Sequence, residues 1–166
     1  MIRNRVVVLV ALTLGFLAGT VVLAGMPSVV KDRFVLGEPV WKEMAVREDL
    51  SPDYETCWKK LVDIIVDRGY EVGFMEKESG YLRTNPNAGL VRLKSNWVYE
   101  VKIIAKLVVN EQDLKAGKKT VDKLRIQVQG HLYKTSKGSL VESYSGYDKL
   151  VLQDMFNDLQ LVFGRQ

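Results

Sequence analysis

The pattern of apolar and polar positions divides the chain into a hydrophobic N-terminal segment and a longer region of mixed periodicity. Residues 6–24 are almost wholly apolar, and no charged residue occurs from Val6 to Val30. Arg3 and Arg5 precede this run. A short basic start followed by a long uncharged run is typical of an export signal or a membrane anchor.

Two interpretations of this segment stay open. As a signal peptide it would be cleaved before Gly25, after the small and aliphatic residues 22–24. As an anchor it exceeds the roughly 20 residues that cross a bilayer, and the two arginines would hold its start in the cytoplasm. Gly15 and Gly19 have a spacing that lets two membrane helices pack closely, so association of two copies is a further prediction.

Beyond this segment we predict a tether over residues 27–39 and a folded domain over 40–166, after the signal or anchor at 1–26. Apolar residues at steps of three and four predict a helix that starts after Ser51 as N-cap and ends before Gly69. A capping-box pattern at Ser145 to Asp148 predicts the start of a second helix, whose apolar stripe reaches Phe163.

Alternation of apolar and polar residues predicts the strands. They fall at residues 40–47, 70–74, 81–84, 97–109 and 124–133, with a short last strand at 140–143. The two longest are apolar on one side only, which predicts a sheet that is covered on one face. The fold class is therefore α+β: an antiparallel sheet of about five strands with two helices on one face. The order is strand, helix, four strands, a short optional strand and helix.

Charge gives little support to a nucleic-acid function. The chain has 24 basic and 20 acidic residues and a pI of about 9.1. Arg3 and Arg5 account for two of the basic residues, which leaves 22 against 20 in the rest. Because no basic stripe with interleaved aromatics is present, we expect no nucleic-acid partner.

Candidate chemistry is sparse. Cys57 lies on the apolar face of the first helix, so we expect a buried thiol, and a single cysteine can form neither a disulfide within the chain nor a cysteine-based zinc site. His131, the one histidine, falls on the polar face of its strand, where a solvated side chain is expected. With no catalytic or phosphate-binding motif, we predict no enzyme, no cofactor and no metal. A polar cleft around His131 would favour a hydrolase instead.

Two places are candidates for partner binding. Tyr133 falls on the polar side of its strand beside His131, and exposed aromatics are enriched at interfaces. The irregular loop after Asn85 is the second place, since loops between ordered strands often carry binding. Its candidate residues are Leu90, Val91, Arg92 and Leu93.

Short motifs give the chain a resemblance. The first helix ends in Asp67-Arg68-Gly69-Tyr70, and a strand and Glu78-Ser79-Gly80-Tyr81-Leu82-Arg83-Thr84 follow. This arrangement resembles the small periplasmic domains of bacterial envelope lipoproteins, such as the C lipoprotein of the outer-membrane β-barrel assembly machinery. The resemblance implies a helix-grip fold over residues 40–163, and it transfers no functional residue. The chain departs from it at Met26, where a lipoprotein would have its lipid-bearing cysteine.

These observations predict a non-catalytic bacterial envelope protein, an accessory or structural subunit that binds other envelope proteins. It would be released into the periplasm after cleavage, or anchored in the inner membrane through residues 6–26. The alternative is a carrier of small lipid-like molecules with an apolar cavity between sheet and helix. A solid core would argue against the carrier, and the residues expected to fill it are Trp58, Phe74, Trp97 and Phe156.

Overall fold

The computed structural model describes residues 26–46, 53–88, 93 and 96–164. They belong to two units, one up to Asp32 and one from Arg33 onward. The described part of the first unit contains the short helix α2 (Ser28–Lys31). Within the described ranges no helix has the length and apolar character needed to span a bilayer. The hydrophobic segment, with Gly15 and Gly19, lies outside these ranges.

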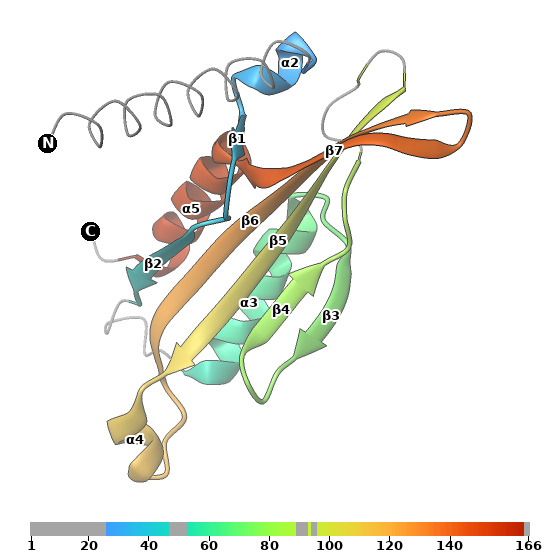
Figure 1. Ribbon diagram of the computed structural model, residues 1–166. Helices are drawn as coiled ribbons and strands as arrows, with labels where there is room; N and C mark the ends of the chain where they lie inside the picture. The colour runs from blue at the N-terminus through green and yellow to red at the C-terminus, as the bar shows by residue number, and fades with distance from the viewer. Residues whose placement is uncertain (1–25, 47–52, 89–92, 94–95, 165–166) are drawn as a thin grey trace, which may run out of the picture. The chain divides into compact units, whose positions relative to one another are not determined.

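The second unit is built on a seven-stranded antiparallel sheet (Figure 1). Its strands are β1 (Phe34–Leu36), β2 (Trp41–Ala45), β3 (Val72–Glu76), β4 (Tyr81–Thr84), β5 (Trp97–Val109), β6 (Val121–Ser136) and β7 (Ser139–Asp148). They lie in the order β1-β7-β6-β5-β4-β3, and β2 pairs with the first part of β6. Every one of these pairs is antiparallel, as the alternating patterns predicted.

Two helices, α3 (Tyr54–Asp67) and α5 (Lys149–Phe163), lie on the same side of this sheet (Figure 1). The sheet face beneath them is apolar, and on β5 the residues from Tyr99 to Leu107 that point toward them are at most 1% exposed. The predicted α+β class and antiparallel sheet are confirmed, whereas the sheet has seven strands rather than about five. The connection between β5 and β6 contains a further helix, α4 (Glu111–Lys115).

The first strand of the sheet was missed because it is only three residues long. Residues 34–36, which the pattern assigned to the tether, pair with the end of β7. Phe34 packs over Gly130 and Gly146, where an added Cβ would lie 3.0 Å from its ring. This strand therefore depends on distant glycines that no local pattern reveals.

The start of the second helix was predicted three residues too early. Ser145 to Asp148 continue β7, and Asp148, not Ser145, is the N-cap of α5. The Asp148 carboxylate accepts hydrogen bonds from the backbone N–H groups of Leu150 and Val151, each 3.0 Å long. Pairing with β6 and β1 keeps these residues extended.

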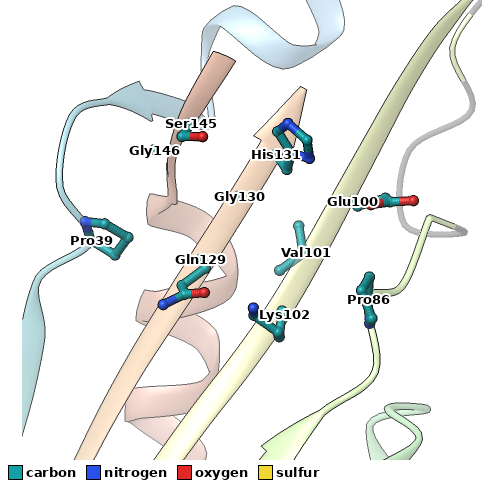
Figure 2. A pocket seen from close by; sticks show the side chains of 10 residues that line it. All are labelled: Pro39, Pro86, Glu100, Val101, Lys102, Gln129, Gly130, His131, Ser145 and Gly146. Atoms are coloured by element: carbon teal, nitrogen blue, oxygen red, sulfur yellow. The ribbon is translucent and has the colours of Figure 1, made fainter. Parts of the chain in front are cut away.

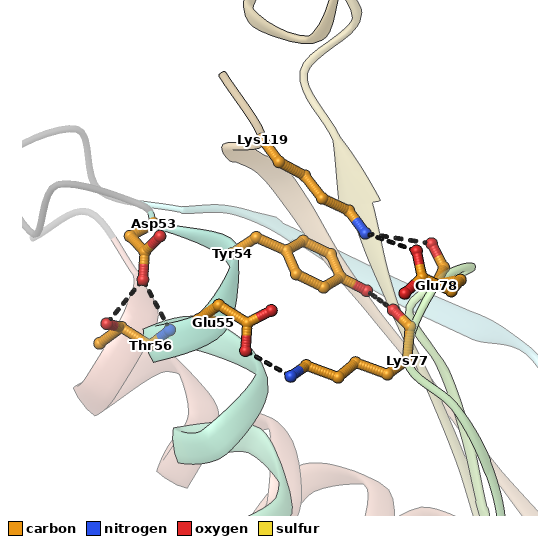
Figure 3. Close-up of polar contacts among 7 residues, drawn as sticks. All are labelled: Asp53, Tyr54, Glu55, Thr56, Lys77, Glu78 and Lys119. Carbon is orange, nitrogen blue, oxygen red and sulfur yellow. Dashed lines mark hydrogen bonds and ion pairs between the residues drawn. The ribbon is translucent and has the colours of Figure 1, made fainter. Parts of the chain in front are cut away.

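Helix α3 is held at its N-terminus by a set of polar contacts (Figure 3). Its N-cap is Asp53, which accepts the backbone N–H of Thr56 at 2.9 Å, whereas the predicted Ser51 lies outside the described residues. The Tyr54 hydroxyl donates to the carbonyl oxygen of Lys77 in the β3–β4 turn. The Lys119 ammonium, which also pairs with Glu78 in that turn, lies 3.8 Å from the centre of the Tyr54 ring. These contacts fix α3 against one end of the sheet.

Candidate functional site

The outer face, defined here as the sheet face opposite α3 and α5, carries the candidate site. Successive side chains of a strand point to opposite faces. The even positions of β5 from Val98 to Lys106 and the odd positions of β6 from Lys123 to Tyr133 therefore share the outer face. The two helices that cover the sheet, among the described residues, lie on its other side (Figure 1).

Aromatic side chains mark the two edges of the outer face. The strand registers place Trp41, Gln127, Ile104, Arg83 and Phe74 in one row across five strands. Trp41 at one end is 37% exposed and Phe74 at the other is 46% exposed, whereas Ile104 between them is 7% exposed. The row therefore presents two exposed aromatic rings on either side of a sunken apolar centre.

Each of these aromatic rings has an arginine beside it. The guanidinium carbon of Arg125 lies 5.1 Å from the centre of the Trp41 ring, and that of Arg83 lies 5.8 Å from the centre of the Phe74 ring. Both distances fall within the range of cation–π attraction. The arginines thus hold the rings in place on the exposed surface.

A cavity of about 390 Å³ opens on the same face. Figure 2 shows its floor, which is formed by residues 100–102 of β5 and 129–131 of β6. Pro39, in the β1–β2 connection, lies on one side and Pro86, in the β4–β5 connection, on the other. Because this cavity lies on the outer face, it is not the cavity between sheet and helix that a lipid carrier was expected to have.

The polar groups near the cavity are hydrogen-bonded to one another. His131 Nε2 lies 2.7 Å from Ser143 Oγ, and the Tyr133 hydroxyl donates to Glu100 Oε1 at 2.9 Å. The hydrogen bond to the Glu100 carboxylate raises the pKa of the Tyr133 phenol. The predicted partner residue Tyr133 does lie on the outer face, half-buried beside His131, with the two ring centres 5.1 Å apart. His131 is likewise half-buried and hydrogen-bonded rather than fully solvated.

The other predicted binding residues are only partly described. Leu90, Val91 and Arg92 lie outside the described residues, and Leu93 is half-buried. The loop therefore stays a prediction.

Sequence reasoning missed Trp41 and Phe74 as surface residues because large apolar side chains suggested a core. In β3, a register shift between Val72 and Phe74 marks a bulge, which breaks the simple alternation and directs Phe74 to the outer face beside Arg83. Arg83 was the one sequence signal for this face, because a charged side chain indicates the side of β4 that lies opposite α3 and α5.

The single cysteine, Cys57, is a buried side chain of α3. Cys57 is 4% exposed, and burial raises the pKa of its thiol, in agreement with the predicted buried side chain. Within the described ranges no three His, Cys, Asp or Glu side chains are grouped so that they would hold a metal ion.

Comparison with known proteins gives no family for this chain: no protein-family model matches it, and no curated protein matches it. The resemblance to periplasmic helix-grip domains therefore stays a prediction.

Proposed function

We propose that this chain is a non-catalytic accessory subunit of the bacterial cell envelope. Residues 6–26 would carry it into or across the inner membrane, and the domain from Arg33 onward would bind another envelope protein in the periplasm. The observation that supports this most is the outer face, where exposed aromatic rings lie beside arginines. Aromatic residues and arginine are enriched at protein–protein interfaces and supply most of their binding energy.

The interior of the domain favours protein binding over the carrier alternative. Between sheet and helices, large side chains are at most 2% exposed: Tyr54, Leu61, Tyr99, Met155 and Phe163. Trp58 joins this core, whereas Phe74 lies on the outer face and Trp97 and Phe156 are half-buried. These buried side chains support a packed interior, whereas only Trp58 of the four residues expected to fill it is buried.

One observation favours a second candidate function, a hydrolase. The Ser143 hydroxyl lies within hydrogen-bond distance of the His131 imidazole, and such a pair can activate a serine nucleophile. His131 also lines the cavity on the outer face. A fluorophosphonate probe separates the two functions. The accessory role predicts no covalent label, whereas a label that is lost in Ser143→Ala would establish a serine hydrolase.

The binding role is tested by photo-crosslinking in living cells. A photoreactive amino acid is placed at Trp41 or Phe74 on the outer face, and at Leu161 as the matched control. Leu161 is 81% exposed on α5, which lies on the other side of the sheet. We expect one discrete adduct from each outer-face position and none from Leu161. Adducts of equal yield from all three positions, or none from the outer face, would contradict the proposal.

A further inference from the structure

Three cationic side chains surround Ile104 on the outer face, and we call them the cationic patch. Lys102 and Lys106 lie two positions before and after Ile104 on β5, and Arg83 lies opposite it on β4. In the described part of the chain, none of the three has an acidic side chain within ion-pair distance. The patch therefore presents three positive charges that form no direct ion pair, around the apolar Ile104. The nearest acidic residue along this face of β5 is Glu100, two positions before Lys102, and its carboxylate accepts the Tyr133 hydroxyl.

The strand register adds a like-charge pair to this patch. Lys106 lies directly opposite Arg125 on β6, an arrangement that destabilises a sheet. Arg125 is compensated on its other side by Glu43, with Arg125 Nε and Glu43 Oε1 3.1 Å apart. Lys106 has no such neighbour among the described acidic residues. A binding partner with acidic groups would relieve this repulsion.

The position of the cavity indicates how a ligand would lie across the cationic patch. Lys102 belongs to the cavity floor, between the walls at Pro39 and Pro86 (Figure 2). Because β5 and β6 form this floor, an extended chain would fit with its axis along the strands. Residues on the same face of a strand repeat every 7 Å or so, which places Lys102 and Lys106 about 14 Å apart. In an extended peptide, residues four positions apart have this separation.

We propose that the cationic patch binds an acidic, extended segment of a partner protein. Two carboxylates four residues apart pair with Lys102 and Lys106, and an apolar side chain between them covers Ile104. This inference rests on the proposed function and specifies the chemistry of its partner. A membrane surface is the competing partner, because Trp41 and Phe74 are exposed on the same face. We favour a peptide because Ile104, the apolar residue inside the patch itself, is only 7% exposed and does not protrude.

The first test measures binding of a probe peptide to the full chain in zwitterionic nanodiscs. The fluorescent peptide has about ten residues, with two glutamates four positions apart and a leucine midway between them. We expect saturable binding that weakens with salt and falls at least roughly tenfold in Lys102→Glu/Lys106→Glu. The matched control, Lys59→Glu/Lys118→Glu, makes the same charge change on α3 and after α4 and should leave binding unchanged.

Three results would overturn the inference. The first is the absence of saturable binding. The second is equal loss in both double variants, which would show a response to net charge alone. The third is capture of phosphatidylglycerol vesicles by the same lysines with no binding of the peptide, which would identify a lipid surface as the partner.

The cellular crosslink separates failure of this inference from failure of the proposed function. The photoreactive group at Trp41 is combined with Lys102→Glu/Lys106→Glu. Loss of the adduct supports an acidic partner. An adduct of unchanged yield overturns the acidic segment while the outer face remains a binding surface. If the chain without the double substitution gives no adduct, the proposed function itself fails.

Discussion

At the scale of single residues, Asp148 joins three parts of the fold through one buried carboxylate. Its side chain is fully buried, accepts the Tyr99 hydroxyl at 2.9 Å and lies 2.5 Å from Arg33 Nε. The same carboxylate caps α5. The start of the domain, the first part of β5 and the last helix therefore meet at one charge.

We expect Asp148→Ala to lower the free energy of unfolding by about 4 kcal/mol, because it leaves Arg33 and Tyr99 without their partner in a buried place. Urea unfolding of the full chain in detergent measures this change. Asp53→Ala is the control, since it removes the N-cap of the other long helix at an exposed position and should cost much less. If both variants lose the same unfolding free energy, Asp148 stabilises the fold only as a helix cap, and its contacts with Arg33 and Tyr99 contribute nothing more.

Because its phenol is buried, we expect Tyr70 to lower the stability of the folded protein at alkaline pH. Burial, helped by the negative charge of Asp148, raises the pKa of Tyr70 to about 12, against an ordinary value of 10. The folded state therefore keeps a proton that the unfolded state releases, and stability falls as the pH rises from 10 toward 12. Tyr70→Phe removes this contribution, so its free energy of unfolding should fall less steeply over that range. Parallel curves for the two proteins would exclude Tyr70 as the cause.

At the scale of elements, a helix or strand could be predicted when the contacts that determine it come from residues nearby in the sequence. The helix α3 and the strands β5 and β6 carry their burial pattern over many residues, so local periodicity was enough to find them. The strand β1 and the last part of β7 depend on each other and on Gly130 and Gly146. There the capping-box pattern at Ser145 was misleading, because strand pairing overrides a weak local preference.

In the candidate site, too, residues could be predicted only where a local pattern marks them. Tyr133 was found because alternation places it on the polar side of β6. Trp41 and Phe74 were missed because only the pairing of five strands brings them into one row. The cavity was missed as well, because its walls come from two connections whose partners the sequence does not reveal.

The β3–β4 turn provides a test at this scale. Gly80 has φ +71°, and a Cβ there would lie 2.6 Å from the carbonyl oxygen of Leu107. Gly117 has φ +78° with no atom close to such a Cβ. We expect Gly117→Ala to cost about 1 kcal/mol of unfolding free energy and Gly80→Ala about 3 kcal/mol, measured by urea unfolding. Similar costs for the two variants would show that the left-handed backbone conformation, and not the close contact with the Leu107 carbonyl oxygen, requires glycine at position 80.

At the scale of the whole molecule, the proposal assigns one role to each part of the chain. The hydrophobic segment at 6–26 would set the location, the buried core would stabilise the domain, and the outer face would bind the partner. These roles agree with the predicted resemblance to periplasmic envelope domains.

The intact mass of the protein in fractionated cells shows whether the hydrophobic segment is cleaved. The full-length mass in the membrane fraction would establish an anchor and make Gly15 and Gly19 worth substituting. A mass that lacks the first 24 residues, in the periplasmic fraction, would establish a cleaved signal. Either result agrees with an envelope protein, whereas a full-length protein in the cytoplasmic fraction contradicts it.

The central claim, an envelope domain whose outer face is covered by a partner, is tested most directly by thiol labelling of spheroplasts. Phe74→Cys and Leu161→Cys are each combined with Cys57→Ser and exposed to a membrane-impermeant maleimide. We predict that position 161 reacts in spheroplasts, whereas position 74 reacts only after the protein is purified away from its partner. Equal reaction at both positions in spheroplasts would contradict a covered outer face, and no reaction at 161 until lysis would contradict the location.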